Sequence, residues 1–167
     1  MLPLDRITEL IVSRKAHIGV IGLGYVGLPL LLRFSKSGFK AIGFDSDVKK
    51  IDQINSGKSY ITHIADYKIQ KAQKAGLSAT TDYRLCAQCD VLILCLPTPL
   101  TEDRKPDLSY LLHTVKALSP HLRSGQLISL ESTTYPGTTE EEILPLISQS
   151  GLTVGRELFL VYSPERE

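Results

Sequence analysis

The sequence predicts an α/β fold in which a doubly wound parallel sheet of about six strands carries helices on both faces. Three observations support this prediction. Short apolar runs alternate with helical patterns along the 167 residues. The run at 91–96 is apolar throughout, as expected of a central parallel strand covered on both faces. The first run, His17–Ile21, leads into Gly22-Leu23-Gly24-Tyr25-Val26-Gly27, a G-x-G-x-x-G turn that is typical of Rossmann-type sheets.

Each expected element has a local signal. The segment 5–13 has apolar residues at helical spacing, and helices at 28–37 and 47–56 are expected to end at Gly38 and Gly57. The remaining expected helices cover 64–75, 81–87, 107–118 and 139–150, and the remaining strands cover 40–44, 77–79, 91–96, 126–130 and 158–161. Pro145 lies inside the last helix and is expected to kink or shorten it.

Composition limits the class of protein. With 43% hydrophobic residues, 22% charged residues and a net charge of +1, the chain is predicted to be soluble and globular, with no electrostatic signal for nucleic acid. No apolar run approaches the roughly 20 residues that cross a membrane, and no signal peptide is evident, so a cytoplasmic location is expected. Cys86, Cys89 and Cys95 fit a reducing compartment, and Cys86-x-x-Cys89 is interpreted as two ordinary thiols in preference to a redox or zinc pair.

The chain divides into an N-terminal helical extension at 1–16 and a Rossmann domain at 17–167. The last strand, at 158–161, is followed by a few residues and no closing helix. We therefore expect the sequence to be truncated before a linker helix and a second domain.

The glycine turn has the chemistry of a dinucleotide site. Gly22 permits the tight turn, Gly24 lets a pyrophosphate approach the backbone, and Gly27 lets the following helix lie close to the sheet. The N-terminus of that helix presents N–H groups to the phosphates, so Tyr25 and Val26 belong to the expected site. A glycine-rich turn without a nucleotide is the less favoured alternative.

Asp45 follows the second strand at the distance expected for the acid that binds the adenosine ribose. A carboxylate there accepts the ribose hydroxyls and repels a 2′-phosphate, which favours NAD over NADP. Lys50 is expected in the same site, where its charge would offset that of a phosphate. The alternative for Asp45 is a plain surface acid.

Polar residues follow other strands at the same sheet edge, where open parallel sheets bind their ligands. Thr98, between two prolines, is either a cofactor contact or a turn-forming hydroxyl. The segments 131–134 and 163–165 follow the fifth and sixth strands. His63 lies in a loop and is interpreted as solvated more readily than as a substrate ligand.

Four motifs together resemble one known family. They lie at 22–29, 95–99, 131–138 and 162–166, and read GLGYVGLP, CLPTP, ESTTYPGT and YSPER. These motifs are similar to those of the N-terminal NAD-binding domain of the UDP-glucose/GDP-mannose dehydrogenase family. The stretches 59–64 and 134–139 look closest to its UDP-N-acetylglucosamine 6-dehydrogenase branch.

The resemblance implies a four-electron oxidation in which the C6 alcohol of a UDP-sugar becomes a carboxylate, using two NAD⁺. It also implies that the substrate is shared with a second domain, whose cysteine forms a thioester, and that the full-length protein is a homo-oligomer. None of the three cysteines here is assigned as that nucleophile. By position, Thr133 carries over as a residue that helps hold the catalytic water at the cofactor, and Glu165 as the glutamate near the thioester. The role of Glu167, the last residue, is left open.

Two other functions are compatible with the glycine turn alone. One is a stand-alone module that senses NAD(H) without chemistry. The other is a different Rossmann dehydrogenase, such as a 6-phosphogluconate or 3-hydroxyacyl dehydrogenase relative. The Ser-Thr-Thr and Ser-Pro-Glu loops at 132–134 and 163–165 favour the nucleotide-sugar dehydrogenase over both.

Overall fold

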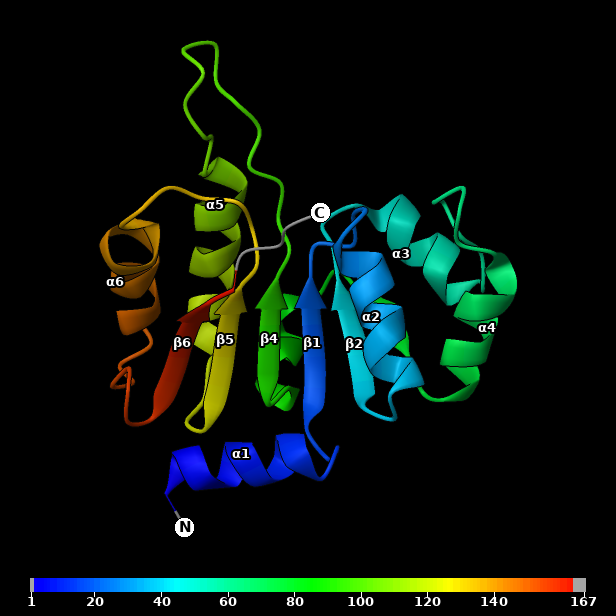
Figure 1. Cartoon of the computed structure of the whole chain (residues 1–167), viewed down its shortest axis with the longest axis horizontal. Coiled ribbons are helices and arrows are strands. Elements are labelled where there is room, and N and C mark those ends of the chain that lie inside the picture. The colour runs from blue at the N-terminus through cyan, green and yellow to red at the C-terminus, as the bar shows by residue number, and fades with distance from the viewer. Residues whose placement is uncertain (1, 164–167) are drawn as a thin grey trace.

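The computed structural model describes residues 2–163, which form a six-stranded parallel sheet with helices on both faces (Figure 1). The strand order is β3-β2-β1-β4-β5-β6, and every pairing within the sheet is parallel. The strands are β1 His17–Ile21, β2 Lys40–Phe44, β3 Ser78–Thr80, β4 Val91–Leu94, β5 Gln126–Leu130 and β6 Leu158–Tyr162. The predicted fold class is confirmed.

The strand order reverses at β1, which lies between β2 and β4. Ile21, the last residue of β1, is level with Phe44 of β2 and with Leu94 of β4. The three strands therefore end at the same height, and the loops that follow them diverge from one point. In open α/β sheets this is the place where ligands bind.

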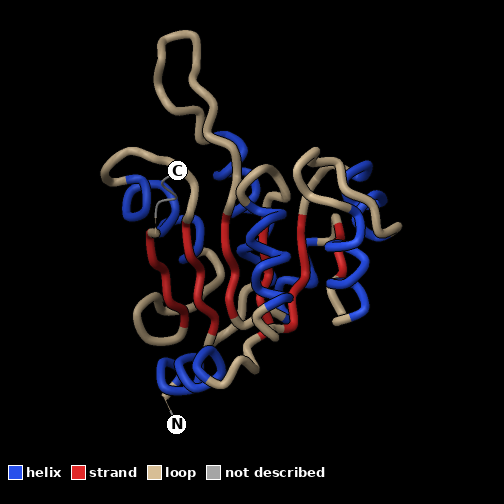
Figure 2. The backbone as a smooth tube through the Cα atoms, turned by 45° about the vertical axis from the view of Figure 1, so that its right-hand side comes forward, coloured by secondary structure: helices blue, strands red, loops and turns tan. Residues whose placement is uncertain are grey.

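Helices cover both faces of the sheet and bury two apolar clusters (Figure 2). The helices are α1 Pro3–Val12, α2 Gly27–Lys36, α3 Val48–Asn55, α4 Asp66–Lys74, α5 Ser109–Leu118 and α6 Leu144–Ser148, with a 3-10 helix at Tyr83–Gln88. Residues of α1 to α4 join one cluster, and residues of α5, α6 and the 3-10 helix join the other. Among the described residues, no helix combines the length and the apolar character needed to cross a membrane.

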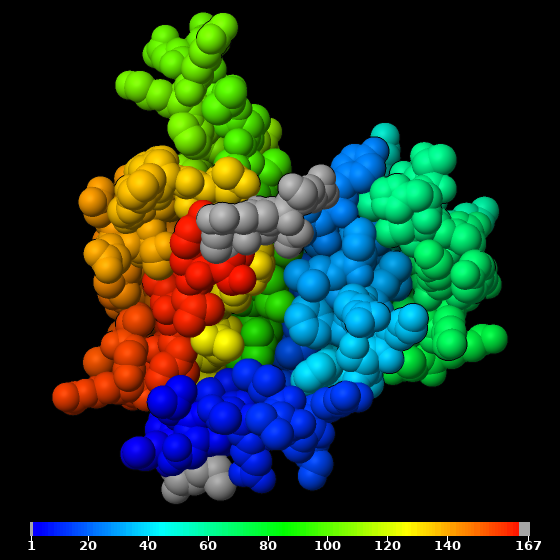
Figure 3. Space-filling view, in the orientation of Figure 1, coloured from blue at the N-terminus to red at the C-terminus, as the bar shows by residue number. Residues whose placement is uncertain are grey.

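The N-terminal extension packs on the same core as the sheet. Helix α1 lies across the starts of the strands, at the edge opposite to the β1 turn (Figure 1). Ile7 of α1 is buried in the first cluster, together with Ala16, which precedes β1. At the other edge, the loop between β4 and α5 projects from the molecule (Figure 3). A single antiparallel bridge between Leu100 and Pro106 closes that loop.

Strand β4 is shorter than predicted. It ends at Leu94, so Cys95 and Leu96 belong to the following loop. The hydroxyl oxygen of Ser132 accepts a hydrogen bond from the Leu96 N–H, and Pro97 cannot donate to a ladder. The strand predicted at 91–96 therefore ends two residues early, and Cys95 is half-buried in the loop that follows.

The helix predicted at 139–150 is divided. Thr138–Ile143 forms a π-helical turn, and α6 covers only Leu144–Ser148. Pro145 lies in the first turn of α6, directly after the π-helical turn, and has no N–H to donate to a carbonyl of that turn. The expected effect of Pro145 is confirmed as a shortening.

Candidate functional site

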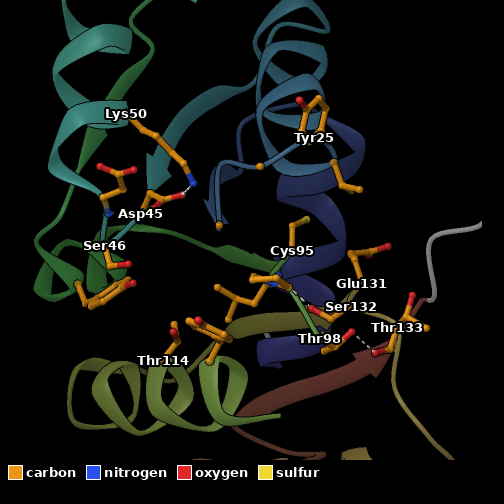
Figure 4. A pocket seen from close by; sticks show the side chains of 18 residues that line it. Tyr25, Asp45, Ser46, Lys50, Cys95, Thr98, Thr114, Glu131, Ser132 and Thr133 are labelled. Atoms are coloured by element: carbon orange, nitrogen blue, oxygen red, sulfur yellow. Dashed lines mark hydrogen bonds and ion pairs between the residues drawn. The ribbon is translucent and has the colours of Figure 1, made fainter. Parts of the chain in front are cut away.

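A cleft of about 770 Å³ opens at the carboxyl ends of the strands, at the point where the strand order reverses (Figure 4). Its walls come from the loops after β1, β2, β4 and β5, from the starts of α3 and of the 3-10 helix, and from the first turns of α5. Of the predicted cofactor residues, those that line it are Gly22, Gly24, Tyr25, Val26, Asp45, Lys50, Thr98 and Thr133. Gly27 is outside the lining, and Glu165 and Glu167 lie outside the described residues.

The three glycines of the turn differ in what surrounds them. Gly22 has a φ of 90°, and a Cβ there would overlap the Cys95 carbonyl oxygen. A Cβ on Gly27 would overlap the Gly22 carbonyl oxygen, so Gly27 allows close packing and does not itself face the cleft. A Cβ on Gly24 would meet no protein atom within 4 Å. The open space at Gly24 is thus on the cleft side, as expected where a phosphate approaches the backbone.

Helix α2 begins directly beside this open space. Its N-cap is Val26, and no side chain caps the helix. The positive end of the helix dipole is therefore open to an anion, although the Leu28 N–H already donates to the Gly24 carbonyl oxygen and Pro29 has no N–H. Tyr25 is 75% exposed, and its ring stacks on His63 at a centroid distance of 6.4 Å. His63 thus has a partner at the cleft rim.

Asp45 is 7% exposed, so the surface-acid alternative is wrong. Its Oδ2 accepts hydrogen bonds from the Leu23 N–H at 2.8 Å and from Lys50 Nζ at 3.1 Å. Its Oδ1 accepts one from the Asp47 N–H at 2.9 Å. The carboxylate therefore ties the glycine turn to the β2–α3 loop, and Oδ1 still has a lone pair to offer a ligand.

Tyr60 supports the glycine turn from outside the cleft lining, a role that sequence reasoning missed, because the stretch 59–64 is noted only for its resemblance to the family. Its hydroxyl donates to the Leu23 carbonyl oxygen at 2.6 Å. Burial and the nearby carboxylates of Asp45 and Asp47 raise the pKa of Tyr60, so the hydroxyl stays a donor. The Leu23 residue is thus held at its N–H by Asp45 and at its carbonyl by Tyr60.

On the other side of the cleft, hydroxyl groups join the loop after β4 to the loop after β5. Thr98 Oγ1 donates to the Thr133 carbonyl oxygen at 2.7 Å. Ser132, which is buried, accepts from the Leu96 N–H at 3.0 Å. The Thr98 hydroxyl therefore joins two loops and does not close its own turn, and Thr98 also lines the cleft.

Aromatic residues that the sequence reasoning also missed form the wall beyond Asp45. Tyr83 stacks on Phe44 at a centroid distance of 6.3 Å, and burial raises the pKa of Tyr83. Tyr110 and Thr114, on one face of α5, complete this wall. A flat apolar surface next to the acid that is expected to bind the ribose suits an adenine ring.

The cysteines have different environments. Cys86 and Cys89 are fully buried away from the cleft, and burial raises their pKa values to about 12. Cys95 is half-buried and lines the cleft. Within residues 2–163, no group of three or more His, Cys, Asp or Glu side chains could hold a metal ion.

Comparison with known proteins agrees with this geometry. Residues 16–167 match the model of the UDP-glucose/GDP-mannose dehydrogenase family, NAD binding domain. The chain belongs to this family. Its cofactor is NAD, and the open glycine turn, the uncapped helix and the buried acid of the cleft fit that dinucleotide.

Several relatives of the family are similar along most of the chain. UDP-N-acetyl-D-glucosamine 6-dehydrogenase of Salmonella typhi is 35% identical over 153 residues, which cover 91% of this chain and 35% of the relative. UDP-N-acetyl-D-mannosamine dehydrogenase of Pyrococcus horikoshii is 36% identical over 155 residues, covering 90% of this chain and 36% of the relative. The chain therefore spans about a third of the length of these relatives.

Solved structures show the same domain. GDP-mannose dehydrogenase of Pseudomonas aeruginosa matches with a TM-score of 0.85 and 32% identity, over 89% of this chain and 36% of that chain. NDP-N-acetyl-D-galactosaminuronic acid dehydrogenase of Methanosarcina mazei matches all of this chain and 38% of its own, with a TM-score of 0.85 and 28% identity. The NAD-binding domain here is thus similar to those of dehydrogenases that are named for different sugar nucleotides.

Proposed function

We propose that this NAD-binding domain serves a nucleotide-sugar 6-dehydrogenase that oxidises the C6 alcohol of UDP-N-acetylglucosamine to a carboxylate with two NAD⁺. The observation that carries the proposal is that one cleft brings the glycine turn and Asp45 together with Thr98 and Thr133. Two relatives named UDP-N-acetyl-D-glucosamine 6-dehydrogenase, each 35% identical, support the choice of sugar. A relative of comparable identity named for UDP-N-acetyl-D-mannosamine supports the C2 epimer as the second candidate.

In this proposal the cofactor lies across the carboxyl ends of the strands. The pyrophosphate rests on Gly24 and the N-terminus of α2, with Tyr25 and Val26 beside it. Asp45 and Lys50 contact the adenosine ribose, and the rings of Tyr83 and Tyr110 receive the adenine. The other half of the cofactor reaches Thr98 and Thr133, past the end of β4.

The catalytic assignments rest on the resemblance to the family. Thr133 would help hold the water that opens the thioester, and its place in the cleft lining supports contact with the cofactor. Glu165 would act beside the thioester. The thiol and the sugar site belong to a second domain, which the greater length of the relatives supports. The same reasoning leaves a homo-oligomer as the proposed state of the longer protein.

Calorimetry with NADH tests cofactor binding by the 167-residue chain itself. We expect weak binding, because one side of the cofactor cleft is open. Labelling gives a second readout: a maleimide should modify Cys95 more slowly with NADH present, while Cys86 and Cys89 react little in either case because of their burial and raised pKa values. A folded chain that gives no heat and no protection at millimolar NADH would contradict the proposal.

Turnover distinguishes the enzyme from the two other candidates. The 167-residue chain should not reduce NAD⁺ with UDP-N-acetylglucosamine or UDP-N-acetylmannosamine. A longer chain with the second domain should form two NADH per sugar, detected by absorbance. Binding of NADH without turnover in the longer chain would favour the sensing module, and turnover only with a different alcohol would favour another dehydrogenase.

A further inference from the structure

Glu131 is a charged cleft residue that the proposed function leaves without a role. It follows β5, and its side chain lies at the end of the cleft opposite to Asp45 and Lys50 (Figure 4). The hydroxyl of Ser129, which is 7% exposed, donates to Glu131 Oε1 at 2.6 Å. Residues two apart on a strand share a face, so this hydrogen bond fixes the carboxylate beside the strand end.

The position of Glu131 corresponds to the nicotinamide half of the cofactor. Asp45 marks the adenosine end beyond β2, and the glycine turn after β1 takes the pyrophosphate. The remaining half must then extend in the other direction, over β4 towards β5. At a spacing of about 4.8 Å between strands, β5 lies roughly 10 Å from β1. Thr98 and Thr133 line this part of the cleft with Glu131.

The two redox forms of the cofactor differ in charge only at the nicotinamide ring, which is cationic in NAD⁺ and neutral in NADH. The other charged side chains in the cleft lining, Asp45, Asp47 and Lys50, all lie after β2, at the adenosine end. Lys50 is also paired with Asp45 at 3.1 Å. Among the described residues that line the cleft, Glu131 is therefore the charged side chain that can distinguish NAD⁺ from NADH.

We propose that Glu131 sets the preference of this domain for NAD⁺ over NADH by placing a negative charge beside the nicotinamide ring. The proposal rests on the proposed function, in which two NAD⁺ are used per sugar. NADH formed by the first hydride transfer must leave while the sugar intermediate remains bound. A carboxylate attracts the cationic ring of NAD⁺ and has no such charge attraction to the neutral ring of NADH. It therefore favours the exchange of NADH for NAD⁺.

Calorimetric titration of the 167-residue chain with NAD⁺ and with NADH tests the proposal. In Glu131→Gln the ratio of the two dissociation constants should shift towards NADH by about fivefold, as expected for the loss of one partly exposed charge pair. Glu131→Lys should shift it further in the same direction, and Glu131→Asp should keep most of the preference. Asp47→Asn is the matched control, since it removes a carboxylate from the adenosine end and should change both constants equally.

Ser129→Ala and salt give independent readouts. Without its hydroxyl donor the Glu131 carboxylate is less well fixed, so Ser129→Ala should shift the ratio in the same direction as Glu131→Gln but less. In the unchanged chain, added salt should reduce the preference for NAD⁺, because it screens the charge pair. An unchanged ratio in both Glu131→Gln and Glu131→Lys, with NADH still bound, would overturn this inference alone. Absence of binding by the unchanged chain would overturn the proposed function and this inference with it.

Discussion

Asp45 has two tasks that a single substitution would disturb together. Its carboxylate holds the Leu23 N–H of the glycine turn and is also the proposed ribose ligand. Asp45→Ala should therefore weaken NADH binding and narrow the preference for NAD over NADP, because the ribose acceptor and the repulsion of a 2′-phosphate are both lost. Dissociation constants for NADH and NADPH measure the two effects separately.

Lys50→Ala is the informative counterpart. Lys50 Nζ lies 3.1 Å from Asp45 Oδ2, so its removal leaves the carboxylate charge less compensated. The preference for NADH over NADPH should then increase, opposite to the effect of Asp45→Ala. If both variants keep the preference of the parent chain, neither residue faces the 2′ position of the ribose.

Substitutions at the glycines of the turn separate two effects, the loss of space for a phosphate and the loss of close packing. Gly24→Ala adds a methyl group where no protein atom lies within 4 Å, so the free energy of unfolding should change by less than about 0.5 kcal/mol. The same methyl group occupies the proposed phosphate position, and NADH affinity should fall about tenfold or more. Thermal melting and calorimetry check the two parts.

Gly27→Ala should behave in the opposite way. A Cβ there overlaps the Gly22 carbonyl oxygen, so the variant should lose stability even without ligand. Gly24→Ala that binds NADH as tightly as the parent chain would show that the pyrophosphate does not approach Gly24.

At the scale of elements, the glycine turn depends on a segment that is distant in sequence. The loop between α3 and α4 carries Tyr60, whose hydroxyl reaches the Leu23 carbonyl 37 residues away. Tyr60→Phe removes only this donor. It should lower the free energy of unfolding by about 1 kcal/mol and weaken NADH binding, because the turn is less well fixed.

Tyr67→Phe is a matched control for that variant. Tyr67 lies on α4 and is 64% exposed, so loss of its hydroxyl should affect neither stability nor NADH affinity. Denaturant unfolding and calorimetry on the two variants compare them directly. Equal NADH affinity in Tyr60→Phe and the parent chain would mean that Asp45 alone holds the turn.

At the scale of the whole molecule, the two ends of the parallel strands have separate roles: the carboxyl ends form the cleft, and the starts of the strands stabilise the fold. The edge opposite to the cleft is held by Arg123, which donates to the carbonyl oxygens of Ala87 and Cys89 and to Asp90 Oδ1 at 2.7 to 2.9 Å. Asp90 Oδ2 in turn accepts from the His17 N–H at the start of β1. These contacts join the starts of β1, β4 and β5 without touching the cleft.

Arg123→Ala should therefore destabilise the chain without changing cofactor binding. The loss of several charge-assisted hydrogen bonds, on a side chain that is about one third exposed, should cost about 2 kcal/mol of unfolding free energy. NADH affinity, measured below the melting temperature, should equal that of the parent chain. A parallel loss of affinity would show that the two edges are coupled.

Much of the fold and of the site follows from the sequence because its signals are local. The alternation of strands and helices predicts a parallel sheet, and parallel strands bring their carboxyl ends to one edge. That rule places Gly24, Asp45, Thr98 and Thr133 near one another before any coordinates are known, and all four line one cleft. Gly38 and Gly57 likewise predicted, to within two residues, where α2 and α3 end.

Other features depend on contacts between distant segments, which no local pattern encodes. The hydroxyl of Ser132 accepts a hydrogen bond from the Leu96 N–H just past the end of β4, where Cys95 lines the cleft. The burial of Asp45 and the reach of Tyr60 depend on how the turn packs against two other loops. The position of Glu131 at the end of the cleft opposite to Asp45 follows from the order β2-β1-β4-β5 in the sheet. Only the tertiary structure decides these, because each is set by packing across the sheet and not by neighbours along the chain.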